Sequence, residues 1–214
     1  MNAPEKFLEN ITEKKIKFKL NGKDTEAFSG ETILEVADRN GLEIPRLCYK
    51  EGYRPDGNCR SCVVEVKGER VLAPSCCRSV NEGMEVHTDS ERAQKSQNLV
   101  LEMLLSDMPT EGSKWENGNS KLAHGELSSW ANKKNVVVRK AFEDHKRTAV
   151  KIDDSHPAMM VSLSACIQCD RCVRACREEQ ANDVIGVSGR GASSKIIFDL
   201  DALMGDSTCV ACGE

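Results

Sequence analysis

The N-terminal part of the chain alternates hydrophobic and polar residues, as strands with one buried face do. In residues 15–20 every second residue is apolar and a lysine or asparagine flanks each of them. Asn21-Gly22 follows, a dipeptide that suits the positive φ angles of a two-residue hairpin turn. A second strand is predicted over residues 23–28, so the pattern predicts a β-hairpin.

A helical period replaces this alternation after the hairpin. Ser29 is expected to cap a helix over residues 31–40, and Gly41 to end it. Three further strands are predicted at residues 63–66, 70–72 and 84–87. The order strand, strand, helix and further strands predicts a small α+β domain in which one helix crosses a sheet.

The second half of the chain shows weaker periodicity. A helix is predicted over residues 90–106, with Leu99, Val100, Met103 and Leu104 on its apolar face. Residues 107–155 are rich in Gly, Asn, Ser and Lys, which predicts a connection with one or two short helices and with Trp115 and Trp130 as packing anchors. The predicted domains are 14–88, a helical or irregular connecting segment 89–155, and 156–214.

Charge and hydropathy exclude several classes of protein. The 214 residues carry a net charge of −4 with both signs well mixed, so no basic stripe for nucleic acid is present. No apolar run has the length of a signal peptide or reaches the roughly 20 residues of a membrane span. We therefore expect a cytoplasmic protein that does not bind nucleic acid and has no membrane span.

Cysteine is unusually frequent, with 11 residues, of which ten fall into spaced groups. In a cytosolic protein thiols stay reduced, so the groups indicate metal binding rather than disulfides. The first group has the spacing Cys48-x10-Cys59-x2-Cys62-x13-Cys76. Four thiolates are what a [2Fe–2S] cluster requires, and the Gly- and Pro-containing loop after Cys48 is suited to wrap it. A zinc site with four cysteine ligands is the alternative, but the ten-residue first loop is longer than those of most such sites. Cys77 is predicted to be a small buried side chain rather than a ligand. The spacing alone leaves open that Cys77 is the ligand in place of Cys76.

The second group, Cys166-x2-Cys169-x2-Cys172-x3-Cys176, has the spacing of bacterial [4Fe–4S] ferredoxins. A further pair, Cys209-x2-Cys212, starts a second such run whose next cysteine is due at position 215. We predict one cluster on Cys166, Cys169 and Cys172 and a second on Cys176, Cys209 and Cys212, because the fourth cysteine of such a run ligates the other cluster. Each cluster is one ligand short in this chain, which we interpret as a fragment of a longer polypeptide.

Three arginines, Arg171, Arg174 and Arg177, recur at every third position beside these cysteines. They are candidates for raising a cluster potential or docking an acidic partner. A solvated face is the interpretation that we favour for them.

The first cysteine group resembles the [2Fe–2S] domain of the large subunits of respiratory NADH dehydrogenases, iron-only hydrogenases and NAD-linked formate dehydrogenases, which implies a β-grasp fold. HPAMMVSLSACIQCDRCVRACREEQANDVIGVSGRG and STCVACGE closely resemble the α subunit of NAD-dependent, molybdenum- or tungsten-containing formate dehydrogenases. LAPSCCR and MLLSDMP point the same way. The resemblance extends from about residue 14 to 214 and implies a [2Fe–2S] β-grasp domain followed by a truncated bacterial 2[4Fe–4S] ferredoxin-like domain.

The resemblance also implies a function. The clusters would relay electrons between a molybdenum or tungsten pterin centre, absent from this chain, and flavin- and NAD-binding diaphorase subunits. The partners would be those subunits and the remainder of the α subunit, and this chain would carry no catalytic centre of its own. Since His87 and His124 have no cysteine near them in the sequence, we expect the histidine-ligated cluster of many relatives to be absent. The alternatives are a stand-alone iron–sulfur subunit of a hydrogenase- or NADH-dehydrogenase-type complex, and a zinc-stabilised structural protein.

Overall fold

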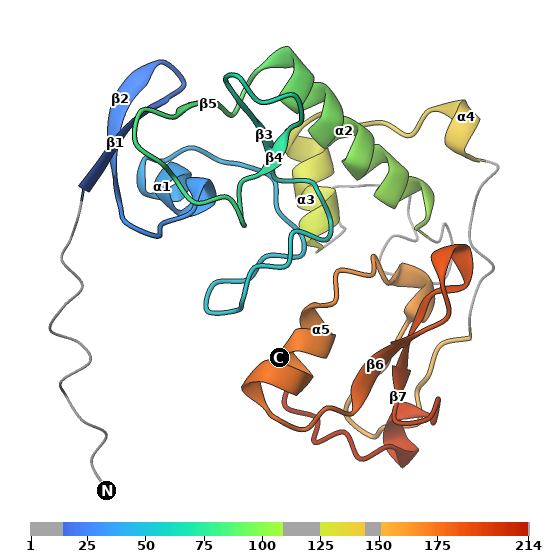
Figure 1. The fold of residues 1–214 in the computed structure, drawn as a ribbon. Coiled ribbons are helices and arrows are strands. Elements are labelled where there is room, and N and C mark those ends of the chain that lie inside the picture. Colours follow the sequence, from blue (N-terminus) through green and yellow to red (C-terminus); the bar gives the residue numbers. More distant parts are fainter. Residues whose placement is uncertain (1–14, 109–124, 144–150, 214) are drawn as a thin grey trace, which may run out of the picture. The chain divides into compact units, whose positions relative to one another are not determined.

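The computed structural model describes residues 15–108, 125–143 and 151–213 (Figure 1). The chain divides into two compact units. The first unit contains residues up to Pro45 together with Cys62–Gln97, and the second contains Arg46–Ser61 together with the residues from Asn98 onward. None of the helices in the described ranges has the length and apolar character needed to cross a membrane.

The first unit begins with the predicted hairpin. Strand β1 (Lys15–Leu20) pairs antiparallel with β2 (Lys23–Phe28), so that Leu20 lies opposite Lys23. Asn21 and Gly22 have φ angles of 50° and 78°, the left-handed values that a type I′ turn requires at both positions. The hairpin prediction is confirmed, and the apolar side of β1 faces the core through Leu20, which is 2% exposed.

A five-stranded sheet extends from this hairpin in the order β2-β1-β5-β3-β4. Strand β5 (Glu85–His87) is parallel to β1, while β3 (Val63–Val66) is antiparallel to β5 and to β4 (Ala73–Pro74). The strand predicted at residues 70–72 is misplaced, because β4 begins three residues later, at Ala73. A turn follows β3, with the Glu69 N–H donating to the Val66 carbonyl at 3.0 Å, and the chain needs residues 70–72 to return to the sheet. Since β4 is an edge strand, Pro74 can occupy it without leaving a ladder hydrogen bond unmade.

Helix α1 (Ile33–Arg39) starts later than predicted. The N-cap is Thr32, not Ser29, and Thr32 and Glu35 form a reciprocal capping box. Residues 28–31 form a turn instead, in which the Glu31 N–H donates to the Phe28 carbonyl at 3.1 Å. The predicted end is confirmed, because Gly41 has a φ of 71° and the following N–H groups return to the last turn of the helix.

The cap gives a direct test of this helix start. Thr32→Ala removes the side-chain acceptor of the Glu35 N–H, so we expect the unfolding free energy to fall by about 1 kcal/mol. In a chain of this size this lowers the melting temperature by about 2–4 °C, as measured by circular dichroism. Thr32→Ser keeps the hydroxyl and is the control. Equal losses in both variants would contradict the role of the cap.

Helix α1 also positions the segment that carries Cys76. The N–H groups of Ile33 and Leu34 donate to the carbonyls of Arg78 and Ser75, at 2.9 and 3.1 Å. Both side chains are fully buried. The first turn of the helix therefore holds residues 75–78 from one side, while β4 holds them from the other.

Helix α2 (Glu91–Ser106) confirms the predicted helix but not its buried face. Leu99 and Met103 are 39% and 52% exposed, whereas Gln97 and Leu101 are buried. The physical reason is that the Gln97 amide donates to the Val63 carbonyl at 2.9 Å. A polar side chain can therefore occupy a core position, because its buried amide is hydrogen-bonded.

The second unit has its own hydrophobic cluster, made by Leu47, Leu101, Met108 and Leu127. Helices α3 (Glu126–Lys133) and α4 (Lys140–Glu143) are the short helices expected in the connecting segment. Trp130 packs against the cluster, which confirms it as a packing anchor, while Trp115 lies outside the described residues. Cys59 and Ile167 pack there too, so this cluster supports two of the cysteine segments.

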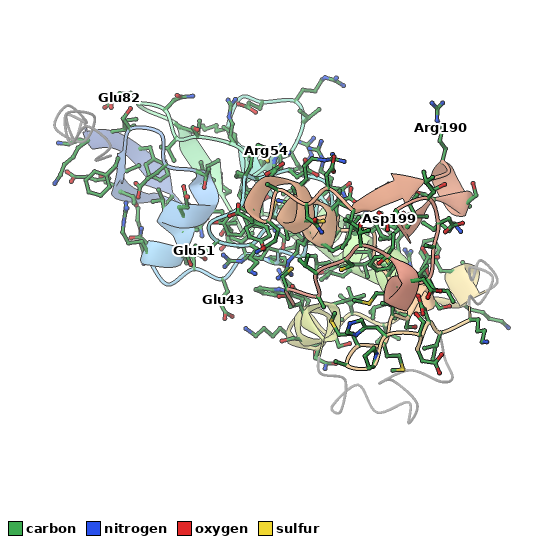
Figure 2. All side chains as sticks on the ribbon, turned by 90° about the horizontal axis from the view of Figure 1, so that it is seen from below. Glu43, Glu51, Arg54, Glu82, Arg190 and Asp199 are labelled. Carbon is green, nitrogen blue, oxygen red and sulfur yellow. The ribbon has the colours of Figure 1, made fainter. Side chains whose placement is uncertain are left out.

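The C-terminal part of the second unit consists of short elements. They are η3 (Leu163–Ala165), α5 (Arg171–Arg174), η4 (Ala175–Glu179), β6 (Ile185–Ser188), η5 (Gly191–Ser193), β7 (Lys195–Phe198) and η6 (Met204–Asp206). Strands β6 and β7 form an antiparallel pair, and η4 continues α5 as a π-helix. Figure 2 shows Arg190 pointing away from the ribbon near the turn between these strands. Asp199, also labelled there, accepts hydrogen bonds from the Thr208 N–H and hydroxyl at 2.8 and 3.0 Å, which holds the chain just before Cys209.

Candidate functional site

Strand pairing in the first unit brings two of the predicted ligands together. Cys62 immediately precedes β3 and Cys76 follows β4, and their Sγ atoms lie 3.4 Å apart. Both side chains are buried, at 1% and 0% exposure. The Ser75 hydroxyl donates to the Cys62 carbonyl at 2.7 Å, which links the two backbones beside the sulfurs. Two cysteines separated by 13 residues are thus held as a pair by the antiparallel strands.

Cys77 differs from Cys76 in its surroundings. Its side chain is exposed, although its Sγ lies 3.5 Å from that of Cys76. The prediction that Cys77 is a buried small residue is therefore wrong. The reason is that residues 75–77 form a turn, in which the Cys77 N–H donates to the Pro74 carbonyl at 3.1 Å, and this turn buries Cys76 while leaving Cys77 on the surface.

A second pair lies on residues 46–61 of the second unit. The Cys59 N–H donates to the Cys48 Sγ at 3.4 Å, and the Cys59 Sγ lies 3.1 Å from the Ser61 hydroxyl. A hydrogen bond between the Cys59 and Cys48 side chains, followed by burial, raises the pKa of the Cys59 thiol. A backbone N–H directed at sulfur is the outer-shell contact that thiolate ligands of iron–sulfur clusters receive.

The run from Cys166 to Cys176 combines a tight loop with a helix. Gln168 and Asp170 have φ angles of 52° and 57°, so the chain winds through left-handed turns before α5 begins. The Cys166 Sγ accepts from the Gln168 N–H at 3.3 Å, and the Cys176 Sγ accepts from the Val184 N–H at 3.2 Å. Both ends of the run therefore show the same N–H to sulfur contact as the loop pair.

The thiols of this run are buried or half-buried. Burial raises the pKa of Cys169. Burial, together with the neighbouring Cys169 and Cys166, raises the pKa of Cys172 to about 11. Metal binding to such thiols displaces their protons, and the metal charge then replaces them.

A cavity of about 270 Å³ lies in the C-terminal part of the second unit. Four of its lining residues are cysteines: Cys172, Cys176, Cys209 and Cys212. Its apolar lining includes Met159, Met160 and Phe198. The structure thus gathers the three cysteines predicted for the second cluster around one cavity. Cys172, predicted for the first cluster, lines it as well, whereas Cys166 and Cys169 do not.

The cysteines of the described ranges do not form a compact single-ion site. Among these residues no three Cys, His, Asp or Glu side chains are gathered closely enough to hold one metal ion. They occur as pairs with N–H donors and around a cavity. The donor set, made of thiols alone, fits iron–sulfur clusters, in which each thiolate binds one iron and inorganic sulfide bridges the irons.

The three arginines of the run have different surroundings. Arg177 is exposed and pairs with Asp183 at 2.7 Å, in agreement with a solvated face. Arg174 is only 5% exposed, so that prediction is wrong for this residue. In the sequence, only the recurrence of arginine at every third position hinted at the burial of Arg174.

Residues 46–61 rest on the Cys166–Cys176 run within the second unit. The Asn58 amide donates to the Gln168 carbonyl at 2.8 Å, and Arg54 forms an ion pair with Glu178 at 2.9 Å. Figure 2 shows Arg54 beside the helical ribbon of this run. The loop with Cys48 and Cys59 and the run with four further cysteines therefore share an interface, which sequence reasoning missed.

Of the two histidines considered as cluster ligands, His87 and His124, the structure describes only His87. His87 lies on β5, where its Nε2 is 3.3 Å from a carboxylate oxygen of Glu85. His124 lies outside the described residues.

Comparison with known proteins identifies the N-terminal domain. Residues 13–91 match the family described as a 2Fe-2S iron-sulfur cluster binding domain. This range includes Cys48, Cys59, Cys62 and Cys76. The family match therefore covers all four residues predicted to bind the [2Fe–2S] cluster.

Similar proteins extend the match beyond this domain. The mitochondrial NADH-ubiquinone oxidoreductase 78 kDa subunit of Candida albicans is 32% identical over 83% of this chain and 24% of its own length. NADP-reducing hydrogenase subunit HndD of Solidesulfovibrio fructosivorans is 32% identical over 91% of this chain and 33% of its own length. The chain thus spans about a quarter to a third of the length of these relatives.

A solved structure shares the fold. A chain of the NAD+-reducing [NiFe]-hydrogenase in the H2-reduced state superimposes with a TM-score of 0.77 at 27% identity. The match covers 92% of this chain and 80% of that chain. The similarity includes the C-terminal part as well as the N-terminal domain.

Proposed function

We propose that this chain, whose residues 13–91 belong to the 2Fe-2S iron-sulfur cluster binding domain family, is an electron-transfer module of a larger oxidoreductase. The observation that carries the proposal is the agreement between that family and the two cysteine pairs. Cys62 pairs with Cys76, and Cys59 with Cys48, all inside the matched range. These four residues would hold a [2Fe–2S] cluster, which supplies a site for one electron at a time.

The C-terminal cysteines extend the proposal to two [4Fe–4S] clusters. Cys166, Cys169 and Cys172 would hold one, and Cys176, Cys209 and Cys212 the other, each with one ligand from outside this set. The N–H donors to the Cys166 and Cys176 sulfurs and the cysteine-lined cavity support this assignment. The family match ends before these residues, so they rest on spacing and geometry.

The residues of the chain contribute position and environment rather than bond chemistry. Backbone N–H groups at Cys59, Gln168 and Val184 stabilise sulfur in its thiolate form. The apolar lining of the cavity limits access of water, which lowers the local dielectric and tunes the reduction potential. The substrate of the whole enzyme would be transformed elsewhere.

Our specific proposal is the iron–sulfur part of a formate dehydrogenase α subunit. The phrases around Cys166–Cys176 and Cys209–Cys212 resemble that family, as described above. The module would relay electrons between a molybdenum or tungsten pterin centre and flavin- and NAD-binding diaphorase subunits. Its partners would be those subunits and the remainder of the α subunit.

A second candidate is an iron–sulfur subunit of an NAD-reducing hydrogenase-type complex. One observation favours it: the similar hydrogenase chain is matched over 80% of its own length, far more than the quarter to third of the longer relatives. In that case the module would exchange electrons with a nickel-containing enzyme. The two candidates predict different metals in the native complex.

Anaerobic purification of the native complex through a tag on this chain tests the specific proposal. We expect stoichiometric molybdenum or tungsten, together with flavin, and formate-dependent reduction of NAD+. Nickel with hydrogen-dependent NAD+ reduction would overturn the formate proposal in favour of the second candidate. A complex with neither flavin nor any of these metals would contradict both.

A further inference from the structure

We infer that Arg174 is a counter-cation shared by the loop that carries Cys48 and by the helix that carries Cys172 and Cys176, and that it raises the reduction potentials of the clusters bound on both sides. This inference rests on the proposed function, because it concerns the centres that those cysteines would hold. It assigns a positioning and tuning role to a residue that binds no iron itself.

The geometry of Arg174 links the two ligand segments directly. Its side chain leaves α5, which carries Cys172 and continues into η4 with Cys176, and its Nη1 donates to the Arg54 carbonyl at 2.6 Å. Its Nη2 donates to the carbonyl of Cys48. One guanidinium therefore joins the backbone of a predicted [2Fe–2S] ligand to a helix with two predicted [4Fe–4S] ligands.

Arg174 has no carboxylate at ion-pair distance in the described part of the chain. The side chain is 5% exposed, and within the described ranges it forms no ion pair; both of its acceptors are neutral carbonyls. Its Nε–H is buried without a hydrogen-bond partner among the same residues. Burying a charge is costly unless an opposite charge is close. The buried charge of Arg174 therefore has no close counter-charge among the described residues.

Asp170, one turn earlier in the chain, interacts electrostatically with Arg174 but forms no ion pair with it in the described part of the chain. The neighbouring arginines each have an ion-pair partner: Arg171 pairs with Glu126 at 2.5 Å, and Arg177 with Asp183 at 2.7 Å. Arg174 is the member of this trio that is buried and lacks such a partner in the described part of the chain.

Iron–sulfur clusters supply the missing negative charge. Four thiolates outweigh the positive charge of a cluster core, so each bound cluster is an anion, and it becomes more negative when it takes up an electron. A buried cation beside it stabilises the reduced form more than the oxidised form. Since Arg174 is hydrogen-bonded to one ligand segment and belongs to the other, its charge should raise both potentials.

The test compares three variants of the anaerobically reconstituted protein. Arg174→Gln removes the charge, Arg174→Lys keeps it but cannot reproduce the two-armed hydrogen bonding, and Arg177→Gln removes an exposed charge from the same run. Iron and sulfide are counted first, and each cluster is then titrated with redox mediators while EPR reports its reduced fraction.

We expect Arg174→Gln to lower the ratio of reduced to oxidised cluster at a fixed potential by about tenfold, for both the [2Fe–2S] centre and a [4Fe–4S] centre. For one electron this corresponds to about 59 mV. Arg174→Lys and Arg177→Gln should stay within about threefold of the unaltered protein. A merely structural role would not distinguish glutamine from lysine in this way.

Different failures have different meanings. If Arg174→Gln holds its clusters and titrates like the unaltered protein, the inference is overturned and the proposed function stands. If Arg174→Gln loses its clusters, the Arg174→Lys variant is the test. A ratio of reduced to oxidised cluster within threefold of the unaltered protein supports the role of the charge, and a tenfold lower ratio overturns it. If the unaltered protein holds no iron, the proposed function fails and this inference with it.

Discussion

Cys62→Ser or Cys76→Ser should abolish the [2Fe–2S] EPR signal of the reduced protein, whereas Cys77→Ser should leave it intact. Cys62 and Cys76 form the buried sulfur pair beside β3 and β4, and an alkoxide or hydroxyl replaces a thiolate ligand poorly. Because metal binding is coupled to folding, the two variants should also melt at a lower temperature. Low-temperature EPR of dithionite-reduced samples and circular dichroism measure both effects.

Cys77→Ser is a closely matched control. Its sulfur lies 3.5 Å from that of Cys76, in the same turn, but its side chain is exposed. If Cys77→Ser lost the signal while Cys76→Ser kept it, the ligand assignment would be reversed. If both Cys62→Ser and Cys76→Ser kept the EPR signal, the proposed site would be contradicted altogether.

Leu47→Ala should destabilise the second unit by about 3 kcal/mol, within the 2–5 kcal/mol range of buried leucines. Leu47 is fully buried in the cluster with Leu101, Met108 and Leu127, and it immediately precedes Cys48. The cavity would loosen the backbone of that ligand as well. Urea unfolding followed by circular dichroism measures the loss of stability.

Leu200→Ala removes the same atoms from a side chain that is 98% exposed and is the control for this change. Its effect should stay within about 0.5 kcal/mol. Equal effects at the two positions would show that Leu47 is not a core residue in solution.

The parts of the fold that were predictable depend on local chemistry. Asn21-Gly22 specifies its hairpin because both residues tolerate positive φ, and Gly41 ends its helix for the same reason. The helix start was misassigned because Ser29 and Thr32 are both good caps. Only the turn over residues 28–31, which depends on Glu31, favours the later one.

Non-local contacts explain what the sequence pattern did not reveal. Gln97 counts as polar in any periodicity, and its burial is favourable because its amide donates to the Val63 carbonyl, 34 positions away. The candidate ligands were recognisable because cysteine spacing is a local property. The burial of Arg174 was not, because its acceptors lie about 120 positions earlier in the chain, at Cys48 and Arg54.

Anaerobic reconstitution with iron and sulfide, followed by metal and acid-labile sulfide analysis and low-temperature EPR, tests the central claim most directly. We predict a brown protein with iron and labile sulfide in equal amounts, and, on reduction, a [2Fe–2S] signal that depends on Cys62 and Cys76. A colourless protein with zinc in place of iron, or with its cysteines oxidised to disulfides, would contradict an electron-transfer role.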